Sequence, residues 1–288
     1  MPLAESKNDP ELLMGAYRAL AVTLYFTGDF EASGQNARCG VEIWRSKREE
    51  FKITEVISPA VACLCYMALS EWHAGAFDSC KRTMAEATVL AKDLNDLQSL
   101  VLALINAGVL GYYEGNHTEV ERCASKIVEL STRHNFATWL PAGTILRGWA
   151  QSGGGQTADG ISSLEAGIQK LRNDGAMLDL PFWLLLKAQA LQLAGRNSEA
   201  LETLEEAEAL AEIRGERHSF AELHRLRGVF LAALGADETQ IEASLCAAIR
   251  IAKEQKSVSL KKRAKATYEE YRKQKASASG GRAFRLPL

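Results

Sequence analysis

Cysteine and histidine are the residues of this chain that could bind a metal or act in nucleophilic catalysis. Cys63 and Cys65 are separated by one residue, so a helix would direct their thiols to different sides. The five histidines form no His-Glu-x-x-His segment, and the chain contains no Gly-x-Ser-x-Gly. We therefore expect no catalytic residue, no metal and no cofactor. The six cysteines lie in apolar helical patterns and are expected to be free and mostly buried: Cys39, Cys63, Cys65, Cys80, Cys123 and Cys246.

A run of three glycines, Gly153 to Gly155, is the one segment that resembles a phosphate-binding loop. No Gly-Lys-Ser/Thr follows it, and the surrounding pattern is helical, whereas a phosphate loop follows a strand. We interpret the segment as a turn between two helices.

The composition is that of a folded domain with a substantial core. Of the 288 residues, 47% are apolar and 24% are charged, and the net charge is -2. The charge is uneven, because 12 basic and only 3 acidic residues lie between Arg250 and Leu288. The chain begins without a basic and apolar leader, and its best apolar run, Leu100 to Tyr113, is too short to span a membrane. We therefore expect a cytoplasmic protein without a membrane partner.

Six glycines mark an internal repeat. They are separated by 47 residues once and by 40 residues thereafter: Gly28, Gly75, Gly115, Gly155, Gly195 and Gly235. Seven positions before each of them lies a small residue, in the order Ala21, Ala68, Gly108, Gly148, Ala188 and Gly228. A fixed period in this range is the sequence signature of a repeat architecture.

Each repeat is predicted to be a helix hairpin. The small residue lets two antiparallel helices approach closely, and the glycine lets the chain reverse with a positive φ. Four prolines, Pro10, Pro59, Pro141 and Pro181, stand just ahead of predicted first helices, where a missing N–H is harmless. We predict an all-α solenoid over 11–257, with about six hairpins near 11–46, 58–93, 98–133, 139–173, 181–214 and 219–256, and a disordered N-terminus over 1–10.

The repeat resembles the tetratricopeptide repeat (TPR), through Gly-x-Phe at Gly28 and Gly75 and through the small residue seven positions before each. The stretches 61–78, 138–154 and 221–236 are similar to the C-terminal TPR region of bacterial regulators. In those proteins an adenylate or guanylate cyclase, or a winged-helix domain, precedes a predicted ATPase domain and then the repeats. The resemblance runs from Leu12 to Arg272 and includes none of those other domains. It implies either a free-standing TPR-like module or a detached part of a larger regulator.

The TPR resemblance also implies a partner groove lined by first helices. The family positions one, four and five residues after the small residue are rich in aromatic residues here, and we name Tyr25, Phe26, Trp72, Tyr112, Tyr113 and Trp149 as the partner groove. Rigid rings with polar tips suit an extended or helical peptide. The alternative is that these rings only pack neighbouring helices.

A basic column precedes the small residue in three successive repeats, at Arg147, Lys187 and Arg227. These side chains are candidates for contact with an anion or an acidic partner, because the arginine fork matches a carboxylate. The alternative is that they pair with glutamates of neighbouring helices, since the helix from Ser198 to Ile213 is heavily acidic.

The basic C-terminal segment permits two interpretations. Leu260, Ala264, Thr267 and Tyr271 continue a helical stripe, which predicts a capping helix over 258–275 that closes the solenoid with a polar face. The alternative is contact with nucleic acid, which we do not expect. Residues 276–288 are predicted to be a disordered tail.

We conclude that the chain is a non-catalytic protein-interaction or sensing module of a bacterial signalling or transcription regulator. Its expected partner is a protein or peptide, such as a cyclase, ATPase or transcription-regulator domain. The alternative is the detached C-terminal part of an adenylate or guanylate cyclase-type ATP-binding regulator, whose catalytic domains would lie on another chain.

Overall fold

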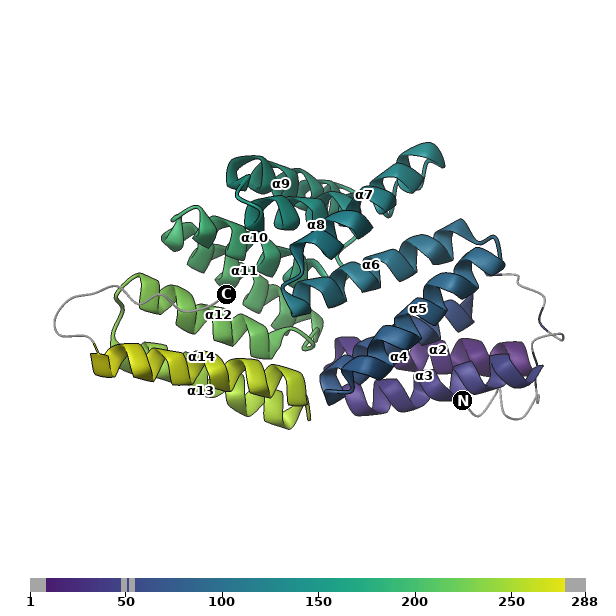
Figure 1. The fold of residues 1–288 in the computed structure, drawn as a ribbon, viewed down its shortest axis with the longest axis horizontal. Helices are drawn as coiled ribbons and strands as arrows, with labels where there is room; N and C mark the ends of the chain where they lie inside the picture. Colours follow the sequence, from purple (N-terminus) through teal and green to yellow (C-terminus); the bar gives the residue numbers. More distant parts are fainter. Residues whose placement is uncertain (1–8, 48–50, 52–54, 278–288) are drawn as a thin grey trace. The chain divides into compact units, whose positions relative to one another are not determined.

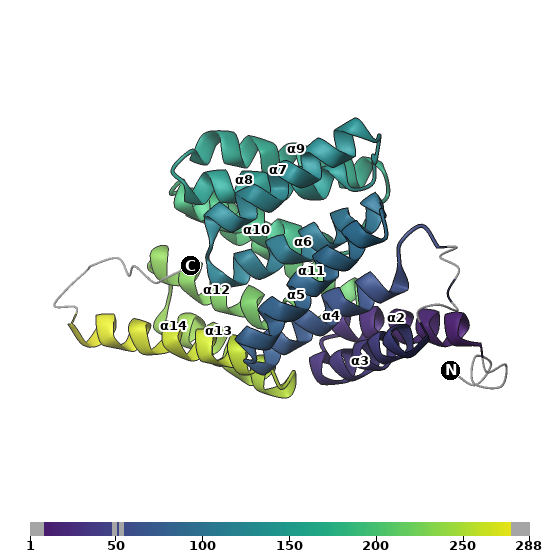
Figure 2. The same ribbon diagram turned by 45° about the vertical axis from the view of Figure 1, so that its right-hand side comes forward.

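The computed structural model describes residues 9–47, 51 and 55–277, and these form thirteen helices and no strand. They divide into an N-terminal unit, Met1–Gly143, and a C-terminal unit, Thr144–Leu288. We call the helix that opens each hairpin its first helix and the one that follows its second helix. The predicted all-α, TPR-like fold of six hairpins and a capping helix is confirmed, and Figures 1 and 2 show the helices of each unit as ribbons.

The N-terminal unit contains three hairpins. Its first helices pack on one another in the order α2, α4, α6, and each hairpin also packs on the next through its second helix. The bounds are α2 Pro10–Phe26, α3 Phe30–Lys47, α4 Pro59–Ala74, α5 Phe77–Asp93, α6 Leu97–Glu114 and α7 His117–Arg133.

The boundary between the units lies within α8, Leu140–Gly153, and the C-terminal unit contains the rest of this helix and the hairpins that follow it. First helices α10 and α12 pack on each other, and α14 packs on both helices of the last hairpin. The remaining bounds are α9 Thr157–Asn173, α10 Leu180–Leu193, α11 Asn197–Arg214, α12 Phe220–Ala233, α13 Glu238–Glu254 and α14 Val258–Ser277.

The repeated glycines lie at equivalent bends between the two helices of each hairpin. Gly115, Gly155 and Gly195 have φ values of 67°, 92° and 75°, in the left-handed region that glycine adopts without strain. At the first of these, the Gly115 N–H donates to the Tyr112 carbonyl at 3.0 Å and the next N–H donates to the Gly111 carbonyl at 2.8 Å. These bonds satisfy the last carbonyls of the helix and end it.

The small residues permit close helix packing. A Cβ atom at Gly148 would lie 2.6 Å from the Gly160 carbonyl oxygen, and one at Gly228 would lie 2.6 Å from Leu245 Cδ2. Neither position has room for a side chain, because backbone or packed core already fills the space. At these two positions, the predicted role of the small residue, to let the two helices of a hairpin approach closely, is therefore confirmed.

A second series of left-handed residues was missed by the sequence reasoning. Asn95, Asn135, Gly175 and Gly215 also recur every 40 residues, and all four have positive φ. They reverse the chain between one hairpin and the next. Asparagine and glycine are the residues that adopt this conformation most readily, so the signal was present in the sequence.

The two ends of the described chain extend slightly into segments that we predicted to be disordered. The Asp9 side chain accepts from the N–H groups of Glu11 and Leu12, which starts α2 at Pro10. At the other end α14 continues to Ser277. The rest of the predicted N-terminus and tail, 1–8 and 278–288, lies outside the described residues.

Helix α14 has the two faces that a cap requires. Leu260, Ala264 and Tyr271 are buried toward α12 and α13, whereas basic residues such as Lys262 and Arg272 are exposed. None of the helices in the described part of the chain combines the length and the apolar character needed to cross a bilayer.

Candidate functional site

The predicted groove aromatics of the N-terminal unit form one cluster around α2, α4 and α6. Trp72 of α4 stacks on Tyr113 of α6 with ring centroids 4.2 Å apart and planes 21° apart. Tyr113 in turn lies 5.2 Å from Tyr112. At the other side of α4, Tyr25 of α2 lies 5.4 Å from Tyr66, edge to face. The rings therefore join three successive first helices.

The members of this cluster differ in how far their side chains are buried. Tyr112 is fully buried, and Tyr25, Trp72 and Tyr113 are no more than 5% exposed. Phe26 is half-buried and is the most accessible of the five. Most of these rings thus pack against rings of neighbouring helices, as the alternative interpretation of the sequence proposed. Contact of these rings with a partner stays a prediction.

Buried His73 belongs to the same cluster; it lies five residues after the small residue Ala68, at a predicted groove position, but was not among the six named groove residues. Its imidazole stacks on Phe30 with ring centroids 3.5 Å apart and planes 4° apart. It also meets the edge of Trp72 at 5.0 Å. A lone histidine in an apolar helix gives no sequence signal that distinguishes such packing from chemistry.

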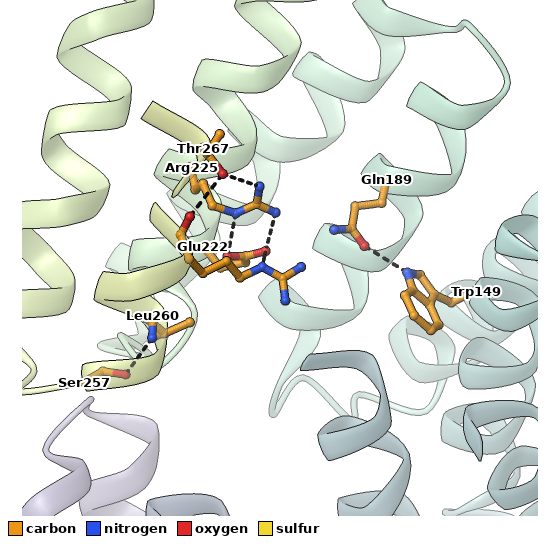
Figure 3. A network of polar contacts seen from close by, with 8 residues as sticks. Trp149, Gln189, Glu222, Arg225, Ser257, Leu260 and Thr267 are labelled. Carbon is orange, nitrogen blue, oxygen red and sulfur yellow. Dashed lines mark hydrogen bonds and ion pairs between the residues drawn. The ribbon is translucent and has the colours of Figure 1, made fainter. Parts of the chain in front are cut away.

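The sixth predicted groove residue, Trp149, belongs to the C-terminal unit. It is 6% exposed, and its indole Nε1 donates to the Gln189 side-chain oxygen at 2.8 Å (Figure 3). The two residues are 40 positions apart, so the bond joins equivalent places on α8 and α10. The polar tip that was expected to contact a partner is already engaged within the repeat.

One column of the first helices stays accessible, and it is the position directly before the small residue. All six side chains in this column are half-buried, although each is followed by a buried residue. We call it the accessible column: Leu20, Met67, Ala107, Arg147, Lys187 and Arg227. It is apolar in the N-terminal unit and basic in the C-terminal unit. The sequence reasoning identified only the basic half.

Two of the three basic residues form ion pairs with the preceding second helix. Lys187 Nζ lies 3.2 Å from a carboxylate oxygen of Glu165. Arg227 lies 3.1 Å from Glu208 and 3.8 Å from Glu205. For these two residues the expected pairing with glutamates is confirmed.

Arg147 differs from the other two basic residues. Its Nε is buried without a hydrogen-bond partner, and no ion pair involving it occurs among the described residues. The residue as a whole is half-buried. An unsatisfied donor of this kind is uncommon in a folded protein.

A buried ionic network between α12 and α14 was not predicted. Glu222 accepts from Arg225 Nε at 2.9 Å and from its Nη2 at 2.7 Å, and both side chains are at most 2% exposed (Figure 3). Arg225 also donates to the Thr267 hydroxyl at 3.2 Å, and Arg263 Nε lies 3.3 Å from Glu222. The network attaches the capping helix to the last hairpin.

A polar pair of the buried His218 and the half-buried Asp179 links the loops that precede α10 and α12. His218 Nε2 lies 3.0 Å from Asp179, and the Asp179 N–H donates to Glu216 at 3.0 Å. Burial raises the pKa of the Asp179 carboxyl, although the neighbouring His218 opposes this effect. These contacts join equivalent loops of successive repeats.

The cysteines are free and mostly buried, as predicted. Burial raises the pKa of the Cys63, Cys80 and Cys123 thiols to about 12. The thiols are therefore protonated at neutral pH, which makes them poor nucleophiles and poor metal ligands. No cluster of three or more potential metal-binding side chains was found in the described ranges.

Comparison with known proteins adds a fold and one distant relative. No family model matches the chain. Over 265 residues, 91% of this chain, it is 24% identical to the uncharacterized protein R02095 of Rhizobium meliloti (strain 1021). The match covers 26% of that protein, so the chain spans about a quarter of the length of this curated relative.

The solved structures with similar folds are helical-repeat proteins. A Rap protein complexed with Competence and Sporulation Factor superposes with a TM-score of 0.65 at 16% identity, over 84% of this chain and 65% of the Rap chain. TPR-like repeats of a Podosopora anserina kinesin light chain give a TM-score of 0.47 at 15% identity, over 71% of this chain and 98% of that chain. The resemblance to cyclase-linked or ATPase-linked regulators stays a prediction. What the fold and the Rap comparison establish together is that this chain is a TPR-like α-solenoid.

Proposed function

We propose that the protein is a non-catalytic interaction module of a bacterial signalling or transcription regulator, and that it binds a peptide or domain of a partner in the solenoid groove along its first helices. The observation that carries the proposal is the accessible column. One half-buried side chain recurs at the same position of each first helix, so each unit presents a series of three such side chains. Solenoids use such serial surfaces to bind extended partners.

The chemistry of the column suggests what the partner offers. Leu20, Met67 and Ala107 provide an apolar half, whereas Arg147, Lys187 and Arg227 provide a basic half. A partner segment with apolar side chains would complement the column of the N-terminal unit, and one with acidic side chains would complement the column of the C-terminal unit. The buried aromatic cluster would serve as the rigid support of this surface, with Phe26 at its accessible edge.

Two further observations support an interaction role over catalysis. The protonated thiols of Cys63, Cys80 and Cys123 are poor nucleophiles. Rap, which has the same type of fold, was solved as a complex with Competence and Sporulation Factor, so a solenoid of this kind can act by holding another molecule.

The test is a binding measurement with matched surface variants. The purified protein would be used to capture a partner from native lysate, and the affinity of that partner would then be measured by calorimetry. Met67→Glu should weaken binding at least tenfold, because it places a charge in the apolar half of the column. Val89→Glu, at an exposed site of second helix α5, should leave the affinity unchanged. Equal affinities for both variants would remove the column from the binding surface.

A second candidate function is favoured by the length of the relative. Because the match covers only 26% of the Rhizobium meliloti protein, the repeats form one part of a longer chain there. The corresponding proposal is that this chain is the detached C-terminal part of an adenylate or guanylate cyclase-type ATP-binding regulator. Purified chain would be added to the product of the neighbouring reading frame, and nucleotide turnover would be measured. A change in turnover supports this candidate, and unaltered turnover rejects it.

A further inference from the structure

The capping helix α14 carries an excess of positive charge. It contains seven basic and two acidic residues. Two of the seven have acidic partners on neighbouring helices: Arg263 Nε lies 3.3 Å from Glu222 of α12, and Lys275 Nζ lies 3.8 Å from Glu242 of α13. The other five form no ion pair within the described ranges of the chain: Lys261, Lys262, Lys265, Arg272 and Lys273.

These cations lie opposite the packing face of α14. The buried stripe that begins at Leu260 and ends at Tyr271 packs on α12 and α13. Four of the five cations are exposed, and spacings of three, ten and eleven residues place them together on the other side of the helix. We call these four the basic face: Lys262, Lys265, Arg272 and Lys273. The sequence reasoning treated capping and nucleic-acid contact as alternatives, but each uses a different side of α14.

The basic face extends along the helix axis. Lys262 and Lys273 are eleven residues apart, which corresponds to about 16 Å of helix. Glu269 is the exposed acidic residue between them. The chain as a whole has a net charge of -2, but the Debye length is about 8 Å at physiological ionic strength. Distant acidic side chains are therefore screened, and an anion at the basic face meets a local excess of positive charge.

The other side chains on this side of α14 indicate which polyanion fits. Val258, at the start of the helix, is the large apolar residue exposed there, and no aromatic residue of α14 is exposed. Partner proteins are usually anchored by aromatic or apolar side chains in pockets, and single-stranded nucleic acid stacks its bases on aromatic rings. A membrane-surface helix inserts its apolar face into lipid, whereas the apolar face of α14 is buried against α12 and α13. The phosphate backbone of a duplex needs none of these features.

We propose that the basic face of α14 binds the phosphate backbone of double-stranded DNA. The wide major groove of B-form DNA admits an α-helix between its bordering phosphates, whereas the major groove of duplex RNA is deep and narrow. Phosphate contacts carry no sequence information, so the binding is independent of base sequence. Helix α14 contributes no residue to the accessible column, and the inference therefore goes beyond the proposed function and does not depend on it.

The test measures binding of the full chain to a fluorescent DNA duplex of about 24 base pairs by anisotropy. Binding should be saturable, and neutralisation of about four phosphates should make the affinity fall on the order of a hundredfold between about 50 and 200 mM salt. A second duplex of unrelated sequence should bind within about twofold of the first. Absence of binding at the lower salt concentration, or an affinity that does not respond to salt, would overturn the proposal.

Matched variants locate the surface. Replacement of all four residues of the basic face by glutamine should weaken DNA binding at least tenfold, and each single replacement should reduce the salt slope by about one. The control variant removes the same charge from exposed positions of second helices α5 and α7, and its affinity should stay within about twofold of wild type. Its substitutions are Lys81→Gln, Lys92→Gln, Lys126→Gln and Arg133→Gln. Equal weakening in both variants would show that only net charge matters and would exclude the basic face.

The replaced side chains are exposed, so circular dichroism should show an unchanged helical fold. A further variant keeps the charge: Lys262→Arg, Lys265→Arg and Lys273→Arg together should retain the affinity for DNA, because arginine also binds phosphate. Loss of binding in this variant would contradict the electrostatic account.

Other polyanions separate DNA from the alternative occupants. Duplex RNA of equal length, single-stranded DNA, polyglutamate of equal charge, and vesicles of phosphatidylserine and phosphatidylcholine should each bind more weakly than duplex DNA. Either nucleic acid binding as tightly as the duplex would overturn the assignment to double-stranded DNA. Polyglutamate binding as tightly would assign the basic face to an acidic protein, and tight vesicle binding that the glutamine variant abolishes would assign it to a membrane surface.

Discussion

The two units of the solenoid join their successive first helices with different chemistry. In the N-terminal unit, α4 and α6 meet through the stacked rings of Trp72 and Tyr113. In the C-terminal unit, α8 and α10 meet through the Trp149–Gln189 hydrogen bond, and α12 meets α14 through the ionic network of Glu222. The backbone repeat is the same in both. The glycine turns and small residues therefore fix the spacing of the helices and leave the side-chain chemistry free to vary.

The difference has energetic consequences. A stacked aromatic pair adds about 0.5–1.5 kcal/mol beyond its buried area, and each ring still packs when its neighbour is changed. A buried ionic network is less tolerant, because the loss of one member leaves its partner charged and desolvated. We therefore expect the C-terminal unit to be more sensitive to single substitutions than the N-terminal unit.

The largest loss in the free energy of unfolding is expected from Glu222→Ala. This substitution leaves the buried Arg225 and the neighbouring Arg263 without their shared carboxylate, and should cost about 3–5 kcal/mol. Urea unfolding followed by circular dichroism would measure it. Glu254→Ala, which breaks the exposed pair with Arg250, should cost less than about 1 kcal/mol. Similar losses for the two variants would mean that the network adds nothing beyond an ordinary surface pair.

A smaller effect is expected from Trp72→Leu in the N-terminal unit. Leucine keeps an apolar side chain but removes the stack on Tyr113, so the loss should be about 2 kcal/mol. A double-mutant cycle with Tyr113→Leu should give a coupling energy of about 1 kcal/mol that does not depend on salt. A coupling near zero would show that the rings contribute only through their buried area.

The backbone of this fold is more predictable from sequence than the contacts between its side chains. Gly115 predicts a turn and Gly148 predicts a close approach of two helices, because few or no other residues fit the backbone geometry at either position. Asn95 and Asn135 carried an equivalent signal for the second set of turns. The residue types at these positions reflect local backbone conformation, which depends mainly on residues nearby in the sequence.

The candidate site was only partly predictable for a physical reason. Whether Tyr112 faces a groove or a neighbouring helix depends on how two helices rotate against each other, and it proves to be fully buried. Glu222 and Arg225 find Arg263 and Thr267 about one repeat further along the chain, through side-chain geometry that spacing alone does not specify. The basic residues were recognisable because a charge in an apolar helix must either reach water or find a counter-ion.

Removal of the polar tip of Trp149 should have an intermediate effect on the free energy of unfolding. Trp149→Phe keeps a ring in the same place but removes the donor to the Gln189 oxygen, and should cost about 1–2 kcal/mol. A double-mutant cycle with Gln189→Leu should give a coupling energy of about 1 kcal/mol. Thermal unfolding of the single and double variants would measure it. A coupling energy near zero would contradict the view that this polar bond holds α8 and α10 together.

The smallest expected effect concerns pH, and here the two units should respond alike. Burial lowers the pKa of His117 in the N-terminal unit and of His224 in the C-terminal unit, where the carboxylate of Glu208 opposes the shift. Each imidazole therefore stays neutral in the folded chain at a pH where the unfolded chain, with a pKa of about 6.5, takes up a proton. The unfolded state binds more protons, so the free energy of unfolding should fall as the pH is lowered from 7.5 to 5.5. His117→Gln and His224→Gln should each flatten this dependence in urea titrations at the two pH values. If one substitution removes the pH dependence and the other leaves it unchanged, the pH sensitivity of stability belongs to one unit only. The expectation that the two units respond alike would then be wrong.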